Sequence, residues 1–262
     1  TPFQNHMAAV ADEERKARPP PSAQPRLHVI AVRRMTDAVN VYLPQPSTNE
    51  ESLAISACRA QLPSLRTTVL SHLRTCLGGD GLAAEHVLLS TISRVLSRHG
   101  DQPIGKLPLY LTNCPPPQAG ALLSPVASSL HEALSLLLPL CAIQPLTINE
   151  LNSGDVAPKK DLEANCIWPA KLQLPHGATL LIDEATMSAG QLSEKGVKGM
   201  QALTSLTERQ QLPYDFTYCA VDFPLDTTII AISAASGNLL PILTKLPIRV
   251  DPNAQQAATT AP

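Results

Sequence analysis

Two short apolar runs most constrain the fold of this chain. One covers residues 179–182 and ends in Asp183 and Glu184, and the other covers residues 227–234. Neither run alternates apolar with polar residues, so each predicts a strand that is buried on both faces. Strands of that kind belong to mainly parallel sheets whose two faces are covered by helices. The chain is therefore expected to form an α/β domain.

Segments with helical and strand-like patterns alternate along the rest of the chain. Apolar spacing and proline positions predict helices at residues 53–58 and 65–77, interrupted at Pro63, and at residues 82–98, 126–138 and 197–210. Further strands are expected at residues 27–31, 107–113, 216–221 and 246–250. This alternation favours a mainly parallel sheet flanked by helices within residues 26–250.

The two ends of the chain differ from this domain in composition. Residues 1–25 combine a run of charges with prolines at 19–21 and 25, and residues 251–262 are low in complexity. Such segments cannot bury enough apolar surface to fold alone. They are expected to be a disordered arm or linker and a disordered tail.

Composition excludes several classes of function. A net charge of -2 gives no general attraction to nucleic acid or to an anionic membrane surface. No apolar run reaches the roughly 18 residues needed to cross a bilayer, and the chain is expected to be soluble and intracellular. The six cysteines form no CxxC pair, so reduced and mostly buried thiols are expected rather than a zinc site or a disulfide framework.

A phosphate-loop pattern of the form GxxxxGK occurs at residues 100–106. Leu107 stands where a functional loop carries the metal-binding Ser or Thr. A functional loop also follows a strand and opens a helix, whereas here a helix is expected before the pattern and a strand after it. We interpret this match as a coincidental turn.

The glycine-rich run at residues 77–86 is a better candidate loop, because it opens the expected helix at residues 82–98. The run contains Gly79 and Asp80, but Glu85 and His86 stand where a nucleotide-binding loop presents Lys and then Ser or Thr. A carboxylate there would repel phosphate, and imidazole is a poor ligand for Mg²⁺. The alternative is purely structural, with Asp80 as the N-cap and Glu85 as a first-turn anion on the helix dipole.

Asp183 and Glu184 follow a buried strand, as the acidic pair of an ATPase does. In such an enzyme the Asp holds Mg²⁺ and the Glu polarises the attacking water. The pattern is short, and a hydrogen-bonded strand end is the plainer interpretation. The run at residues 227–235 offers Ser233 where an ATPase typically places Asn. A residual nucleotide-binding ATPase that uses Asp183 and Glu184 remains the alternative function.

Other catalytic patterns give no positive support for an enzyme. The chain has no GxSxG or HExxH motif, and its seven histidines are scattered. No catalytic residue, metal site or cofactor is therefore predicted.

Several segments taken together resemble a known family. They are Pro-Arg-Leu-His-Val-Ile at 25–30, Leu-Gly-Gly-Asp-Gly-Leu-Ala-Ala-Glu-His at 77–86, Pro-Ile-Gly-Lys-Leu at 103–107, Leu-Thr-Asn-Cys-Pro at 111–115, Leu-Ile-Asp-Glu at 181–184, Gly-Gln-Leu at 190–192 and Tyr-Asp-Phe-Thr-Tyr at 214–218. In this order they resemble the minichromosome maintenance (MCM) complex-binding protein family over about residues 25–250. The resemblance implies a nuclear, non-catalytic partner of MCM helicase subunits. It also implies roles in MCM complex assembly and disassembly during DNA replication, and in sister-chromatid cohesion.

The resemblance further implies a degenerate relative of the MCM ATPase module, of the AAA+ class. Gly79 to His86 lies over the helicase pattern GDPxxAKS, and residues 182–184 lie over its IDE. The helicase hairpin carries Lys that contacts DNA, whereas residues 211–229 contain no Lys or Arg. No direct sequence-specific nucleic-acid binding and no membrane contact are expected. Tyr214, Phe216 and Tyr218 are candidate partner-binding residues, with packing inside the hairpin as the alternative.

Overall fold

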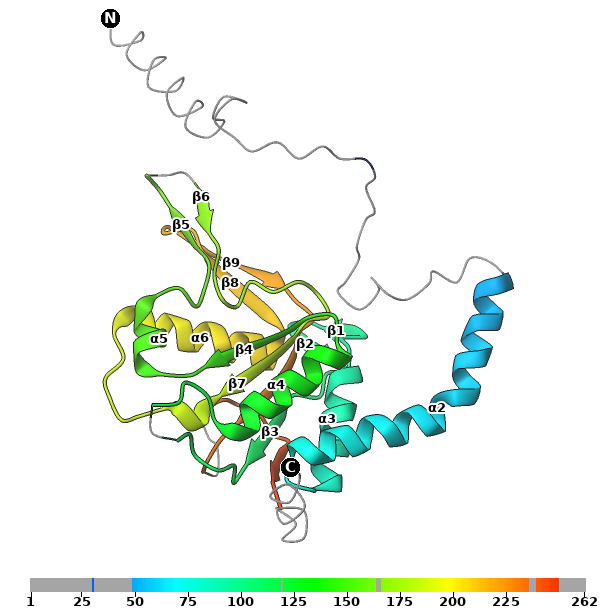
Figure 1. The fold of residues 1–262 in the computed structure, drawn as a ribbon. Coiled ribbons are helices and arrows are strands. Elements are labelled where there is room, and N and C mark those ends of the chain that lie inside the picture. Colours follow the sequence, from blue (N-terminus) through cyan, green and yellow to red (C-terminus); the bar gives the residue numbers. More distant parts are fainter. Residues whose placement is uncertain (1–29, 31–48, 119, 164–165, 236–238, 250–262) are drawn as a thin grey trace, which may run out of the picture.

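The computed structural model of the chain describes residue 30 and residues 49–118, 120–163, 166–235 and 239–249. The expected arm, the tail and, apart from Ile30, the strand expected at 27–31 lie outside these residues. Two sheets and one separate hairpin make up the strands of the described part of the chain (Figure 1).

The larger sheet has five strands, and every neighbouring pair in it is parallel. Its order is β11 (Lys245–Pro247), β3 (Leu109–Thr112), β10 (Thr228–Ile232), β7 (Thr179–Asp183) and β4 (Cys141–Pro145). All residues of β3, β7 and β10 are buried. This confirms the predicted α/β fold with a parallel sheet, and it confirms the strands expected near residues 107–113, 179–182 and 227–234.

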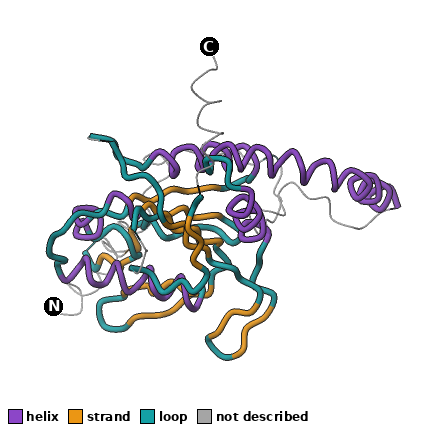
Figure 2. Tube along the Cα trace, turned by 90° about the horizontal axis from the view of Figure 1, so that it is seen from below, coloured by secondary structure: helices purple, strands orange, loops and turns teal. Residues whose placement is uncertain are grey.

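Helices cover both faces of this sheet, so the domain has three layers (Figures 1 and 2). On one face lie α2 (Asn49–Cys76), α3 (Gly81–Ile92) and α4 (Pro125–Leu137), which pack against Leu109, Leu111, Leu181, Ile230 and Ile232. On the other face lie α5 (Ile148–Ser153) and α6 (Glu194–Arg209), which pack against Tyr110, Leu180, Ile182, Ile229 and Ala231. Successive side chains of each strand therefore enter opposite cores, as the period of two requires.

The smaller sheet projects beyond the three-layered body (Figure 1). Its order is β6 (Cys166–Trp168), β5 (Lys159–Asp161), β8 (Gln211–Asp215) and β9 (Ala220–Pro224). The strand β8 enters the core through the buried side chain of Leu212, and the half-buried Tyr214 packs against the same core. Every residue of β6 and of β9 is exposed, so the two edge strands of this sheet face away from the core.

Gln210 connects α6 to the projecting sheet and is buried at its base. It adopts a left-handed conformation, with φ of 53°, and its side-chain amide donates to the carbonyl of Leu206 while its own carbonyl accepts from the amide of Leu225. Its Oε1 accepts from the amide of Thr227 at 2.7 Å. The same residue therefore holds the chain where it leaves the body and where it returns.

A separate hairpin, β1 (Ser97–His99) and β2 (Gln102–Ile104), stands where the end of a long helix was expected. The helix α3 ends at Ile92, so the prediction of a helix over residues 82–98 is wrong beyond that residue. The next residues bond to distant partners instead: the amide of Val95 donates to Asp226, and the Arg98 guanidinium donates to three carbonyls near the base of the projecting sheet. Tertiary hydrogen bonds have overridden the helical pattern.

Pro63 does not interrupt the first helix, because α2 continues through it. The prediction of two separate helices is therefore wrong. Proline removes one amide and leaves the carbonyl four residues earlier, that of Arg59, without its helical partner. This stretch of α2 is exposed, so water can bind that carbonyl. Figure 1 shows α2 bending along its length, which is the usual response to an internal proline.

The strand expected at residues 216–221 is also wrong, because the chain reverses direction there. Residues 216–219 form the turn between β8 and β9, with Thr217 at φ of 73° and the amide of Phe216 bonded to the carbonyl of Cys219. The strand expected at residues 246–250 is observed as Lys245–Pro247. Helix α5 and strands β4, β5 and β6 lie in proline-punctuated stretches for which no element was predicted.

Candidate functional site

The carboxyl edge of the five-stranded sheet holds the acidic pair that the sequence singled out. Asp183 ends β7, and its side chain is fully buried. Its Oδ2 accepts the amide of Ser124 at 2.6 Å, and its Oδ1 accepts the amide of Ala185 at 3.1 Å. The carboxylate therefore caps the short helix η2 (Glu184–Thr186) and fixes the start of α4. This geometry is that of a hydrogen-bonded strand end.

Glu184 occupies a different environment one residue further on. It is half-buried, and its Oε2 has no hydrogen-bond partner among the described residues. Burial raises the pKa of this carboxyl to about 7, and the charge of Lys245 opposes the shift only in part. An acid that loses its proton near neutral pH is suited to proton transfer. This is the one observation at the edge that favours a residual enzyme.

The loop from β3 to α4 is the connection that joins an inner strand of the sheet to a helix, as a phosphate loop does. Residues 113–124 contain no Lys or Arg, and three successive prolines begin at Pro115. Prolines have no amide hydrogen and cannot donate to phosphate. One amide at the start of α4, that of Ser124, already donates to Asp183. The loop therefore lacks the cation that phosphate binding needs, and its prolines and Ser124 offer no free amide to a phosphate.

The run at residues 77–86 joins two helices, α2 and α3, rather than a strand and a helix. Asp80 caps α3 as expected: its Oδ1 accepts the amides of Leu82 and Ala83, and its Oδ2 accepts that of Arg249 beyond β11. The remaining sequence-predicted positions of this run are Gly79, Glu85 and His86. Gly79 lies in the turn before the cap, with φ of 91°.

Glu85 and His86 both make contacts that stabilise helices. Glu85 forms an ion pair of 3.1 Å with Arg66 of α2, and it lies beyond the first turn of α3, so the expected first-turn position is wrong by a residue. The ring of His86 bonds to the carbonyl of Leu82. The run thus joins α2 to α3 and, through Asp80, contacts the residues that follow β11. A phosphate loop would instead follow a strand.

The match at residues 100–106 forms the turn and second strand of the β1–β2 hairpin, which confirms that it opens no helix. Lys106 is buried and forms an ion pair of 2.7 Å with Asp226, next to β10. Burial lowers the pKa of Lys106, although Asp226 opposes that shift. Lys106 therefore anchors the hairpin to the sheet.

The candidate partner-binding residues lie at the tip of the projecting sheet. The ring of Tyr214 meets the ring of Phe223 edge to face, with centroids 4.5 Å apart, and its hydroxyl accepts from Gln173. Phe216 is half-buried, whereas Tyr218 is 88% exposed. Tyr214 thus stabilises the hairpin, and Tyr218 presents its ring to solvent.

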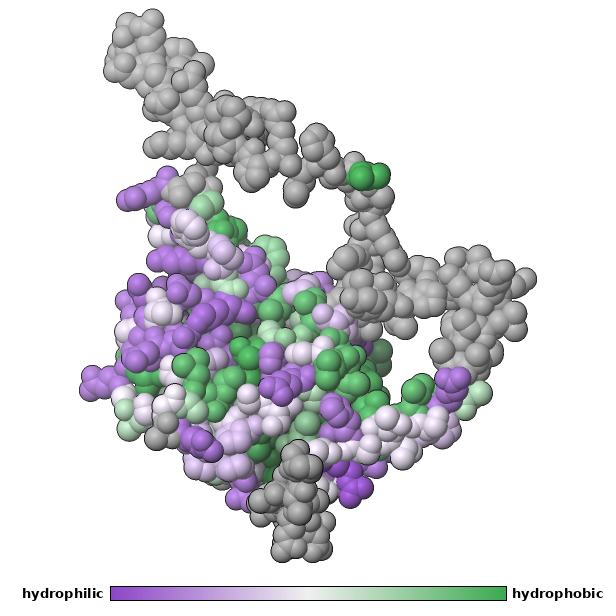
Figure 3. Space-filling view, viewed as in Figure 1, coloured by the Kyte–Doolittle hydropathy of each residue, from purple (hydrophilic) through white to green (hydrophobic). Residues whose placement is uncertain are grey.

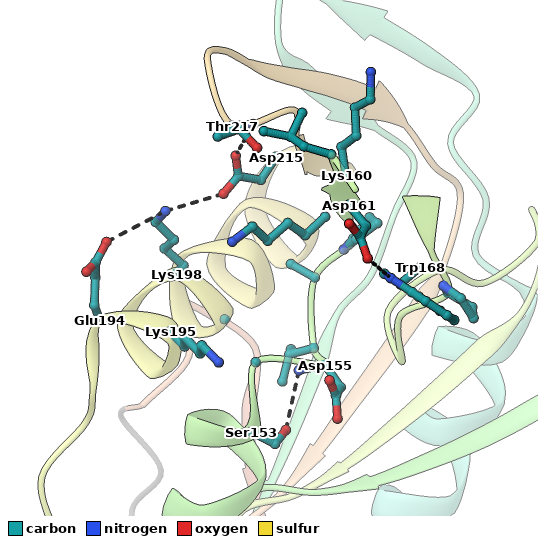
Figure 4. A pocket seen from close by; sticks show the side chains of 18 of the residues that line it. Ser153, Asp155, Lys160, Asp161, Trp168, Glu194, Lys195, Lys198, Asp215 and Thr217 are labelled. Atoms are coloured by element: carbon teal, nitrogen blue, oxygen red, sulfur yellow. Dashed lines mark hydrogen bonds and ion pairs between the residues drawn. The ribbon is translucent and has the colours of Figure 1, made fainter. Parts of the chain in front are cut away.

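A cleft of about 750 Å³ opens between the projecting sheet and the start of α6 (Figure 4). Its charged lining residues are Asp155, Lys159, Lys160, Asp161, Glu163, Glu194, Lys195, Lys198 and Asp215. Lys198 lies between Glu194 and Asp215, and the indole of Trp168 donates to Asp161. Since charges of both signs alternate across the cleft, it does not select an anion or a cation.

The comparisons with known proteins agree with the resemblance found in the sequence. A family model described as Mini-chromosome maintenance replisome factor matches residues 3–261. The chain belongs to this family. It is 32% identical over 252 residues to the Mini-chromosome maintenance complex-binding protein of Salmo salar, and 34% identical to the proteins of that name in Homo sapiens, over 234 residues, and Drosophila melanogaster, over 248 residues.

These alignments cover 95%, 88% and 92% of the chain, and 39%, 35% and 39% of the respective relatives. The chain therefore spans less than two fifths of the length of these members of the family. The family model is described as a replisome factor, and these relatives are named as MCM complex-binding proteins.

The sequence did not indicate which residues would contact Asp183 at the carboxyl edge of the five-stranded sheet. Ser124 and the loop at residues 113–124 escaped notice, although the order of strand, proline-rich turn and helix was predicted around them. The glycines at 78–81 directed the prediction to a connection that joins two helices, because glycine content is visible in a sequence and the elements on either side of a turn are not.

Two further expectations concern metals and cysteines. The described residues hold no group of three or more His, Cys, Asp or Glu side chains placed to bind a metal ion, and no helix among them is long and apolar enough to cross a membrane. All five described cysteines are free. Of these only Cys114 is buried, and burial raises the pKa of its thiol to about 12. The expectation of mostly buried thiols is wrong, since Cys166 and Cys219 are exposed.

Proposed function

We propose that this chain is a non-catalytic binding protein of MCM helicase subunits, acting in the nucleus in assembly and disassembly of the MCM complex during DNA replication and in sister-chromatid cohesion. The family supports the partner, because its members are named as MCM complex-binding proteins. The single observation that carries the non-catalytic part is the use of both Asp183 oxygens by backbone amides.

The same proposal includes a degenerate AAA+ core. Across the sheet, the order of the five parallel strands is β11, β3, β10, β7 and β4. If these five strands are numbered by their order along the chain, the order across the sheet is 5-1-4-3-2. A phosphate loop joins a strand to a helix, and the acidic pair of an ATPase follows a buried strand. In this chain those places are the loop at residues 113–124 and the pair Asp183 and Glu184. We therefore propose that the degenerate phosphate loop is formed by residues 113–124 and not by residues 79–86.

The chemistry at these places supports binding rather than hydrolysis. The loop lacks the Lys that would hold the phosphates, and its one serine, Ser124, uses its hydroxyl to cap α4 by accepting the amide of Ala127. The Asp that would bind the metal through water is directed at the start of α4. A core of this kind presents an ATPase-like shape to a helicase subunit without turning over nucleotide.

Tyr218 is the partner contact that the geometry of the hairpin favours among Tyr214, Phe216 and Tyr218. Tyrosine supplies a large ring with a polar end, and such residues are enriched where a few contacts carry most of the affinity. Tyr214 instead packs on Phe223, so its loss would destabilise the hairpin itself.

Capture of purified MCM subunits, presented one at a time to the immobilised chain, tests the proposal. At least one subunit should bind, and Tyr218→Ala should weaken that binding about tenfold or more. Leu243→Ala removes another highly exposed apolar side chain, one that precedes β11, and should leave binding unchanged. If no subunit binds the intact chain, the proposed partner is wrong.

The second candidate function is a residual nucleotide-binding ATPase, and the unpartnered Oε2 of Glu184 is what favours it. Titration calorimetry with ATP and Mg²⁺ separates the two candidates. The binding-protein proposal expects no heat of binding. Saturable binding that Asp183→Asn abolishes would establish the alternative instead.

A further inference from the structure

The outer edge of β9 is an unpaired strand edge. This strand is the last of the projecting sheet, and β8 is its only strand partner among the described residues. All five of its residues are exposed. An exposed edge of this kind offers backbone amides and carbonyls to a strand from another chain.

The hydrogen bonds at the two ends of the hairpin fix which backbone groups point outward. The amide of Phe216 bonds to the carbonyl of Cys219, and the amide of Leu225 bonds to the carbonyl of Gln210. Bonded pairs alternate with non-bonded pairs in an antiparallel ladder, so Val221 and Phe223 exchange bonds with β8. The amide and carbonyl of Ala220 and of Asp222 therefore face away from the sheet.

Side chains on this edge alternate in character. Val221 and Phe223 lie on one face, beside Tyr214, and are 42% and 43% exposed. Asp222 lies on the opposite face, between them in sequence. Figure 3 shows hydrophobic atoms on the projecting sheet beside a hydrophilic tip. The edge has an apolar face and an acidic face.

Charge on this hairpin has one sign. Residues 211–229 contain no Lys or Arg, and their three aspartates are Asp215, Asp222 and Asp226. Asp215 pairs with Lys198 and Asp226 pairs with Lys106. No described cation pairs with Asp222. Within the described part of the chain, Asp222 is thus an unpaired anion placed between outward-facing backbone groups.

Natural edges are protected against strand addition by charged side chains, prolines, bulges or a covering element. Among the described residues, the only such feature of β9 before Pro224 is the charge of Asp222, which opposes strands of like charge and admits one that carries a cation. A protein whose function is binding, as proposed above, has a use for such an edge. The free aspartate selects a partner strand of complementary charge.

We propose that β9 receives an extended segment of the MCM subunit as a fifth strand of the projecting sheet. This segment carries a Lys or Arg opposite Asp222, flanked on both sides by apolar residues that lie over Val221 and Phe223. Main-chain bonds to Ala220 and Asp222 supply affinity, and the apolar-basic-apolar pattern supplies specificity. The inference rests on the proposed function and names the kind of segment that the partner inserts.

The test compares three substitutions at one position in the full chain, against the MCM subunit that the intact chain captures. Asp222→Pro removes the outward amide but no bond to β8, and proline is tolerated on the outer side of an edge strand. Asp222→Lys keeps the amide and reverses the charge. Asp222→Asn keeps the amide and removes the charge. Asp101→Lys, in the turn of the β1–β2 hairpin, is the matched charge control, and urea unfolding of each variant checks the fold.

Binding should fall at least tenfold for Asp222→Pro and Asp222→Lys and by a smaller factor for Asp222→Asn, with Asp101→Lys unchanged. If the intact chain captures a subunit and folded Asp222→Pro captures it equally well, the strand addition is refuted while the proposed function stands. If the intact chain captures no subunit, both are refuted. Self-association of the chain that Asp222→Pro abolishes would assign the edge to a second copy and would also overturn the inference.

Discussion

Glu184→Gln should stabilise the fold at pH 8 and have little effect at pH 5. In the folded chain burial raises the pKa of this carboxyl from 4.5 to about 7, whereas in the unfolded chain the carboxyl is in water. A carboxyl whose folded pKa is raised contributes stability that is present below pH 4.5 and is lost as the pH rises through about 7. Glutamine stays neutral throughout and keeps that contribution.

The magnitude follows from the shift and from the exposure of the side chain. One pKa unit corresponds to about 1.4 kcal/mol, so full burial would give a ceiling of about 3 kcal/mol. Glu184 is only half-buried, and water screens its charge. We therefore expect the stability difference between Glu184→Gln and the parent chain to grow by about 1 kcal/mol between pH 5 and pH 8.

Urea unfolding of both proteins at pH 5 and pH 8 measures this difference, since every other titrating group cancels between them. Glu208→Gln, on the exposed side of α6, gives the baseline for the same chemical change. A difference that is equal at the two pH values would refute the conclusion that partial burial raises the pKa of the Glu184 carboxyl. A difference that shrinks as the pH rises would mean that the charge of Lys245 outweighs burial.

Three further substitutions test contacts described above, each by urea unfolding with a folded spectrum as control. Asp183→Ala leaves one buried and one partly buried amide without an acceptor and should cost about 2 to 4 kcal/mol. Lys106→Met leaves Asp226 without its cation and should cost about 3 kcal/mol, with much of the loss recovered when Asp226→Leu is added. Asp80→Ala removes the N-cap of α3 and the bond to Arg249 and should cost about 1 to 2 kcal/mol. Losses below 0.5 kcal/mol in any of these would contradict the contact concerned.

The sequence predicted well which strands are buried in the sheet. The strands β3, β7 and β10 are short, apolar and inside the sheet, so their sequences contain the pattern that their environment requires. Helix α4 begins at Pro125 within a residue of its predicted start, and Asp80 caps α3 because a short polar side chain before a helix has little alternative. These features depend on local chemistry.

The errors arose where distant contacts decide the structure. Residues 93–98 carry a helical pattern, yet Asp226 and the carbonyls near Gln210 bind them from more than 100 positions away. In the proposed ATPase-like core, the place of the phosphate-like loop depends on the order of the strands in the sheet, and no spacing along the chain reports that order. Whether the amide of Asp222 points outward likewise depends on which residue pairs of β8 and β9 are hydrogen-bonded, and only the three-dimensional structure fixes this.

Gln210 precedes β8 and also bonds to the amides of Leu225 and Thr227, which follow β9. The two ends of the β8–β9 hairpin are therefore held together at one residue of the domain. Both of its ends are tied to the same residue, so the cost of closing the loop between them grows only slowly with length. Insertions or deletions around residues 216–219 would leave β10 in its place in the core. The tip can therefore vary in length and composition among related chains while the body keeps its register, which would let one scaffold fit partners of different shape.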